Sequence, residues 1–511
     1  MTQQLSAQDA QFLYLQGGNT LTHVMGINLY DPSTAPGGQV RFKDIIAHFA
    51  SRMHMSPVFK RKLYRLPLDL DHPYWIEDPD FELEAHLYHA RLPEPGDWRQ
   101  FCIQVARHFS RPMDMDRPLW DAFVLEGLDR IPGVAPGSYA IMTRIHHAAI
   151  DGASAAHMFV ALSDVDPNGT PVLQQVPPAT LGQQPNALQV MARMVSANLS
   201  SPVRFMTSLA RLSPALLNAA QTRLAQPAGE RSGVPKTLFN APISQHRMFD
   251  ATDFALSDLS AIRKLVPGAT INDVVLTICA GALRAYLTKH KALPDQPLVA
   301  VAPINLRPAK GDASVPGNNI SAMSVELPTD CADPAERLRL VREFTAVAKE
   351  AKAGISARVM TDLTQHIPGA TMAGVARILT NPRFAPRQAN VYISNVPGPQ
   401  VPLYMNGAIS TRQYGMAPLA NNMGLFIATP SYAGRMSFCI TSDREIMRDV
   451  DVLRQCIEAA FAELLVLAKA APLAVAEPHA PKPKRAARPP KPNKAGATTP
   501  RHPIARPKSK R

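Results

Sequence analysis

Two adjacent histidines followed by an Asp-Gly pair are the residues of this chain best suited to chemistry. The stretch runs from Arg144 to Gly152 and contains His146, His147 and Asp151. A neutral imidazole accepts a proton near neutral pH, and a nearby carboxylate can fix its tautomer and stabilise the imidazolium. Gly152 lacks a β-carbon and would let a substrate or another backbone approach closely. These residue types predict general base catalysis.

The flanking sequence places the histidines on a turn between a strand and a helix. Residues 138–143 form an apolar, β-prone run, and residues 153–162 suit a helix. Neighbouring side chains on extended backbone point in opposite directions, so one imidazole would face a cavity while the other packs. An alternative is that Asp-Gly is a plain turn beside two packing histidines. A metal site of His146, His147 and Asp151 is disfavoured, because neighbouring strand positions diverge and no other His/Cys cluster lies nearby in sequence.

The spacing His-His-x-x-x-Asp-Gly resembles the active-site motif of CoA-dependent acyltransferases with the chloramphenicol-acetyltransferase fold. Other segments narrow this resemblance to the bacterial wax ester synthase/diacylglycerol acyltransferase family, over about residues 5–465. These segments are residues 5–13 with 22–24, the Arg-Pro-Leu-Trp of 117–120, the Asn-Asp motif within 270–276, and residues 394–399. The chain departs from the family pattern at Gln16, where an acidic residue is expected, and at Asn305, where serine is usual.

The resemblance implies an O-acyltransferase that moves a long-chain acyl group from acyl-CoA to diacylglycerol or a long-chain fatty alcohol. It implies no resident cofactor and no metal, with acyl-CoA as a co-substrate. His147 would be the general base, and the alcohol would attack the thioester directly. His146 and Asp151 would position the base, with an arginine as an alternative partner of Asp151.

The Asn-Asp motif supplies two candidate substrate-binding residues. The side-chain amide of Asn272 could donate a hydrogen bond to a developing oxyanion or a substrate carbonyl. Asp273 is the second candidate, but it also lies three residues after Thr270, where it suits the first turn of a helix capped by that threonine.

Strands interleaved with helices predict a layered α/β fold, which the resemblance specifies as two chloramphenicol-acetyltransferase-like subdomains joined by a helical crossover. We expect an N-terminal half over residues 1–165, a crossover over 166–240, a C-terminal half over 241–470 and a disordered tail over 471–511. The pattern predicts helices over 42–53, 98–109, 256–265, 334–352 and 451–467, and strands over 24–30, 298–304, 391–394, 423–429 and 435–441.

The crossover has an unusual composition. Residues 167–229 contain no acidic residue, and apolar side chains recur at helical spacing from Phe205 to Leu224. One interpretation is an ordinary bridging segment packed on the body. The other is a lid or interfacial helix pair that rests on anionic lipid, with arginines toward phosphate.

The tail carries most of the formal charge of +13, since residues 472–511 hold eleven basic residues and one acidic residue. Its Pro, Lys, Arg and Ala composition cannot build a core and predicts disorder. It could be merely solvated, adhere to an anionic membrane or lipid-inclusion surface, or bind nucleic acid through counterion release.

Absent targeting signals and scattered cysteines bear on location. The N-terminus has no secretory pattern, no apolar run reaches about 18 residues, and the five cysteines fit neither a disulfide framework nor a zinc site. We expect a cytoplasmic protein, not secreted, peripheral on the inner face of the plasma membrane or on lipid inclusions.

Two alternative functions stay open at this point. One is an acyltransferase for carrier-bound acceptors, and the other is a catalytically silent coat protein of lipid inclusions or nucleic acid. The oligomeric state is not predicted.

Overall fold

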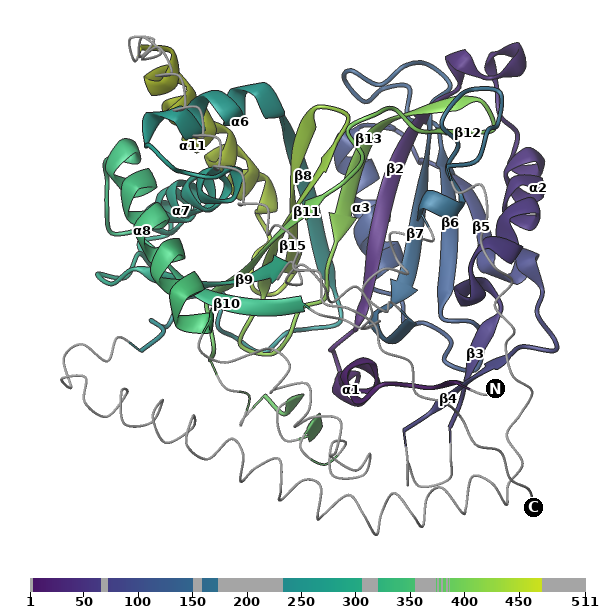
Figure 1. Ribbon diagram of the computed structural model, residues 1–511, viewed down its shortest axis with the longest axis horizontal. Helices are drawn as coiled ribbons and strands as arrows, with labels where there is room; N and C mark the ends of the chain where they lie inside the picture. The colour runs from purple at the N-terminus through teal and green to yellow at the C-terminus, as the bar shows by residue number, and fades with distance from the viewer. Residues whose placement is uncertain are drawn as a thin grey trace, which may run out of the picture. The chain divides into compact units, whose positions relative to one another are not determined.

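Two six-stranded sheets form the framework of the protein in a computed structural model (Figure 1). The structure describes residues 3–65, 72–149, 159–172, 233–305, 320–353, 374, 376–377, 380–382, 385 and 387–470. Contacts divide the chain into a compact unit, Met1–Ala470, and a second unit, Ala471–Arg511. The described residues all belong to the first unit.

The first sheet carries the histidine pair and has the strand order β12-β13-β2-β7-β6-β5. Its strands are β2 (His23–Asp31), β5 (Leu87–Arg91), β6 (Trp120–Glu126), β7 (Tyr139–His146), β12 (Tyr404–Met405) and β13 (Ala408–Met416). β7 is central and antiparallel to both β2 and β6, with His23 opposite His146. Below this sheet, β1 (Gln3–Gln4), β3 (Arg61–Tyr64) and β4 (Tyr74–Glu77) form a small antiparallel sheet.

The second sheet has the order β10-β9-β11-β14-β15-β8 and mixes parallel and antiparallel pairs. Its strands are β8 (Arg247–Ala255), β9 (Leu298–Asn305), β10 (Ile320–Leu327), β11 (Val391–Pro397), β14 (Leu425–Tyr432) and β15 (Arg435–Asp443). β11 is parallel to β9 and β14, whereas the β14–β15 hairpin is antiparallel. The predicted strands over residues 423–429 and 435–441 thus correspond to two antiparallel neighbours, β14 and β15.

The helices pack on these sheets in layers. They are α1 (Ala7–Leu15), α2 (Phe42–Arg52), α3 (Trp98–Phe109), α6 (Leu256–Ile262), α7 (Ile271–Lys289), α8 (Pro334–Ala353) and α11 (Val450–Ala470). α6, α7, α8 and α11 lie beside the second sheet in Figure 1 and share one buried apolar core with it. α2 packs on one face of the first sheet, and α3 packs on the other face together with residues of β8 and β15. The predicted layered α/β fold with two subdomains is confirmed.

Strand β13 connects the two subdomains. It lies in the part of the sequence assigned to the C-terminal half, yet it pairs antiparallel with β2 and extends the first sheet. It also packs beside β14 and β15. A strand from beyond the expected division at residue 241 therefore belongs to the first sheet, and that division stays a prediction. Most of the crossover (residues 173–232) and the whole tail lie outside the described residues.

Local sequence signals account for the start of α7. The Thr270 hydroxyl accepts a hydrogen bond from the backbone N–H of Asp273, and the Asp273 carboxylate accepts one from the Thr270 N–H. This reciprocal cap satisfies two donors that the first helical turn would leave free. α7 has the length and apolar composition of a membrane span, but most of it is buried in the protein's own core, which is typical of a core helix.

Candidate active site

The two histidines sit where β7 ends and a 3-10 turn, η7 (His147–Ala149), begins. The backbone N–H of His146 donates to Leu119 O at 3.0 Å, and that of His147 donates to Thr22 O at 2.9 Å. The turn itself is held from outside, because the Arg61 guanidinium donates to Ala149 O at 2.9 Å. Both flanking strands and the small sheet thereby fix the backbone on which the imidazoles stand.

His146 is fully buried and both of its ring nitrogens are engaged. Nδ1 accepts the backbone N–H of Ala148 at 3.1 Å, so the proton lies on Nε2. Nε2 lies 2.5 Å from Gln16 Oε1 and 2.8 Å from Thr22 Oγ1, and the Thr22 hydroxyl donates to the same Gln16 oxygen at 3.0 Å. Burial, with smaller contributions from neighbouring positive groups, lowers the pKa of His146 to about 3. A neutral imidazole with both nitrogens occupied holds structure and has no free lone pair for a substrate.

His147 has different surroundings. Its ring stacks on Phe12 of α1, with centroids 3.8 Å apart and an interplanar angle of 18°. Its buried Nδ1 makes no hydrogen bond to another described residue. Burial lowers the pKa of His147 to about 4, and its own backbone acts weakly in the opposite direction. The imidazole is therefore neutral at pH 7, the form that accepts a proton.

Behind the histidines, a buried ion pair ties β7 to β6 and to the end of α3. Arg144 donates to both carboxylate oxygens of Asp121, at 2.9 and 2.5 Å. It also donates to the backbone carbonyls of His108 and Arg111, at 2.8 and 2.7 Å. His23, opposite His146 in the sheet, reaches Phe109 O at 2.7 Å through Nε2. These contacts fix the strand ends that carry the site.

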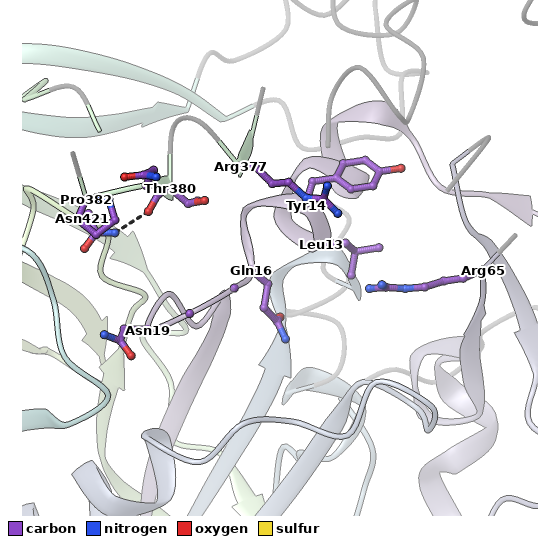
Figure 2. A pocket seen from close by; sticks show the side chains of 12 residues that line it. Leu13, Tyr14, Gln16, Asn19, Arg65, Arg377, Thr380, Pro382 and Asn421 are labelled. Atoms are coloured by element: carbon purple, nitrogen blue, oxygen red, sulfur yellow. Dashed lines mark hydrogen bonds between the residues drawn. The ribbon is translucent and has the colours of Figure 1, made fainter. Parts of the chain in front are cut away.

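A cavity of about 500 Å³ is lined in part by Gln16, the hydrogen-bond partner of His146 (Figure 2). Leu13, Tyr14, Gln16 and Asn19 of α1 and the following turn line one wall of it. The remaining lining residues shown in Figure 2 are Arg65, Arg377, Thr380, Pro382 and Asn421, with Asn421 Nδ2 donating to Thr380 O at 2.7 Å. Side-chain amides and guanidinium groups dominate this lining. Such donors suit the carbonyl or phosphate oxygens of a substrate.

The predicted site residues are only partly brought together. Asp151 and Gly152 lie outside the described residues, as does any metal site that would include Asp151. Among the residues that the structure describes, no group of three or more His, Cys, Asp or Glu side chains could hold a metal. Asn272 lies half-buried in the first turn of α7 and lines neither of the two cavities described for this structure.

Asp273 has a structural place. It is buried, caps α7 and accepts a hydrogen bond from the Thr345 hydroxyl at 2.8 Å. The capping alternative is thus confirmed, and these bonds occupy both carboxylate oxygens. A substrate-binding role for Asp273 stays a prediction without support from its surroundings.

Sequence reasoning missed the contacts that hold the histidines. Phe12 and Thr22 belong to the segments that carry the family resemblance, but the sequence alone predicted no chemical role for either residue. Gln16 stood out only as a departure from the family pattern. The motif at residues 117–120 is explained by Leu119 O, which receives the His146 N–H, and by the Trp120 indole, which donates to Phe59 O at 2.9 Å.

A glycine explains part of another predicted segment. A β-carbon at Gly398 would lie 2.3 Å from Ser431 O, so only glycine fits where β11 ends against β14. The Gly398 N–H also donates to Ser431 Oγ at 3.3 Å. The Asn-Val-Pro-Gly-Pro sequence therefore has a packing reason in the second sheet.

Comparison with known proteins gives consistent matches over nearly the whole chain. Residues 5–275 match the family model of the wax ester synthase/diacylglycerol acyltransferase catalytic domain, and residues 316–465 match that of the corresponding C-terminal domain. A protein of Mycobacterium tuberculosis described as a diacylglycerol O-acyltransferase is 34% identical over 473 residues, which cover 91% of this chain and 90% of that protein.

Two solved structures are similar to this chain over most of its length. The wax ester synthase/diacylglycerol acyltransferase of Marinobacter aquaeolei is 26% identical, with a TM-score of 0.65, and the match covers 91% of this chain and 100% of that one. The first condensation domain of the CDA synthetase is similar in fold, with a TM-score of 0.52 at 15% identity over 91% of this chain and 96% of that one.

Proposed function

Because this chain belongs to the wax ester synthase/diacylglycerol acyltransferase family and is an acyltransferase, we propose that it moves a long-chain acyl group from acyl-CoA to an alcohol. The acceptor is diacylglycerol, a long-chain fatty alcohol, or both, and the product is triacylglycerol or wax ester. The observation that carries the proposal is the pair of imidazoles with divided roles. One has both nitrogens occupied, and the other is neutral and has a buried Nδ1 without a hydrogen bond to another described residue.

In the proposed reaction, His147 accepts the hydroxyl proton of the alcohol as the oxygen attacks the thioester carbonyl carbon. A C–O bond forms, the carbonyl electrons move onto oxygen, and the collapse of this oxyanion breaks the C–S bond. The leaving CoA sulfur takes the proton back from His147. No acyl-enzyme forms, and no cofactor or metal enters. A positioned general base contributes about 10²- to 10⁴-fold to such a step.

The surrounding residues support this chemistry by position. Gln16, Thr22 and the β2–β7 register hold His146 and, through the shared backbone, His147. Stacking on Phe12 restricts the His147 ring to one plane. The polar cavity beside Gln16 offers amide and guanidinium donors for the polar end of a substrate. Asp151 and Asn272 keep their predicted parts, orientation of the base and donation to the oxyanion.

The test is product formation by the purified full chain. Palmitoyl-CoA is supplied with either hexadecanol or dioleoylglycerol on lipid vesicles, and ester and free thiol are measured together. Equal amounts of ester and thiol with either acceptor support the proposal and identify the preferred alcohol. No ester with either acceptor from a folded protein would contradict it and favour a carrier-bound acceptor or a silent coat protein.

We also propose that the enzyme works in the cytoplasm, peripherally on an anionic membrane or on lipid inclusions. The support is the concentration of basic residues in residues 472–511. Deleting residues 471–511 should release the protein from vesicles that contain anionic lipid. Unchanged vesicle binding by the shortened protein would mean that the tail does not hold the protein on the membrane.

A further inference from the structure

A second, larger cavity lies on the α3 side of the first sheet. It is a groove of about 950 Å³ between α3, the start of β8 and the start of α11. The apolar part of its lining, here called its floor, includes Ile103, Ala106, Phe249, Val450 and the Trp98 ring. Seven arginines line it against two carboxylates. An apolar floor under a surplus of guanidinium groups is the lining expected for a ligand that has both a ring and negative charge.

Two of the arginines have structural roles. The Arg247 side chain is fully buried and lies 3.2 Å from Asp443. Arg454 pairs with Asp250 at 3.0 Å and with Glu458 at 2.7 Å. Their charges are therefore neutralised within the fold. One of the two lining carboxylates, Asp250, is neutralised in the same way.

Four arginines of the groove are exposed and have no carboxylate partner among the described residues. They are Arg99, Arg107, Arg111 and Arg444. The first three follow one another at intervals of eight and four residues, so α3 and its C-terminal extension present them along one face with Ile103 between. The fifth exposed arginine, Arg448, pairs with Glu445 at 2.9 Å. Like charges gathered without partners repel one another, and a bound anion relieves this repulsion.

A hydrogen bond links the groove to the cavity that Gln16 lines. Arg247, which lines the groove, donates to the backbone carbonyl of Asn19, which lines the cavity. The Asn19 amide donates in turn to Ile243 O at 2.8 Å. Arg111, which follows α3, accepts a hydrogen bond through its backbone carbonyl from Arg144, two residues before His146. A ligand seated in the groove therefore lies next to the elements that carry the histidines.

We propose that this groove binds the 3′-phosphorylated adenosine diphosphate end of acyl-CoA. The proposal rests on the proposed function, and it assigns the unpartnered arginines to the phosphates and the apolar floor with Trp98 to the adenosine. Arginine recognises phosphate through paired N–H donors and stacks on flat rings. A concave site suits one molecule, whereas a lipid surface would require a flat or protruding basic patch.

Substrate truncation provides the kinetic test. The full chain, Arg107→Gln/Arg111→Gln and the control Arg263→Gln are assayed with palmitoyl-CoA and with palmitoyl-pantetheine, which lacks the nucleotide. Arg263 is an exposed arginine of η8 (Arg263–Leu265) that lines neither cavity. The ratio of kcat/KM for palmitoyl-CoA over palmitoyl-pantetheine should fall roughly tenfold or more in the double variant, through a higher KM for palmitoyl-CoA. The control should keep the ratio. An unchanged ratio in the double variant overturns the proposal.

Direct binding separates this inference from the proposed function. Adenosine 3′,5′-bisphosphate carries no acyl group, so its affinity can be measured by calorimetry whether or not the protein forms ester. Binding to the full chain that the double variant loses supports the groove even if acyl transfer fails. Equal binding by both proteins overturns the proposal. Loss of binding to anionic vesicles with nucleotide binding intact also overturns it, in favour of a lipid contact.

Discussion

Removal of the Asp121 carboxylate should expose how strongly the site depends on its buried ion pair. Arg144 and Asp121 side chains are only 4% and 10% exposed, and the guanidinium contacts both carboxylate oxygens. Burial raises the pKa of Asp121, but the contact with His108 Nε2 at 3.2 Å and the hydrogen bonds from Arg144 outweigh it and hold that pKa below its ordinary value. The carboxylate is therefore charged at neutral pH, and its loss leaves a buried guanidinium without a counter-charge.

The expected cost follows from that uncompensated charge. Breaking a buried pair by removing one partner costs about 3–5 kcal/mol, a large share of the roughly 5–15 kcal/mol that stabilises a typical domain. Asp121→Ala should therefore lower the free energy of unfolding by about that amount. Asp121→Leu/Arg144→Met removes both charges and should recover at least half of the loss. Recovery stays incomplete because the carbonyls of His108 and Arg111 lose their donor.

The assay is urea unfolding of the full chain and both variants, followed by circular dichroism. The reasoning is wrong if Asp121→Ala lowers the free energy of unfolding by less than about 1 kcal/mol, because a buried arginine that loses its counter-charge should destabilise the fold by more than that. It is also wrong if the double variant is as unstable as the single one. In that case the pair would matter for packing and not for charge.

Three further changes probe the histidines and the α7 cap. Because the pKa of His147 is lowered to about 4, kcat/KM should stay level as pH falls from 8 to about 5 and drop only near pH 4. A pH–rate profile in which kcat/KM falls with a midpoint near pH 6.5 would contradict this. Thr22→Val removes one hydroxyl from the hydrogen bonds around His146 and should lower the free energy of unfolding, measured by urea titration, by about 1 kcal/mol. An unchanged free energy of unfolding would contradict this prediction. Thr270→Val should cost about 0.5–2 kcal/mol through loss of the cap, whereas Thr270→Ser, which keeps the hydroxyl, should retain stability in the same titration.

Local features of the structure could be predicted from sequence because neighbouring residues determine them. Thr270 and Asp273 stand at the spacing of a helix cap, and α7 begins there. The predicted helices over 98–109 and 334–352 match α3 and α8 to within a residue, since apolar periodicity reports which face is buried. The apolar, β-prone run at residues 138–143 likewise placed His146 and His147 at the end of a strand.

Long-range features could not be predicted in this way. β13 pairs with β2 across more than 370 residues of sequence, and nothing within either strand identifies the partner. In the sequence, Gln16 is only a departure from the family pattern, although its side-chain carbonyl oxygen accepts a hydrogen bond from His146 Nε2. The arginines of the groove come from α3 and the residues just after it, from β8, from the loop after β15 and from α11, so they become a cluster only in the folded chain.

The central claim is that His147 is the base in acyl transfer, and steady-state kinetics of His147→Ala test it most directly. The matched control is His54→Ala, since His54 is exposed and lines neither cavity. With saturating palmitoyl-CoA and the preferred alcohol at pH 7, His147→Ala should lower kcat about 10²- to 10⁴-fold, while the control stays near the intact chain. A folded His147→Ala protein that keeps kcat within a few-fold of the intact chain would contradict the account.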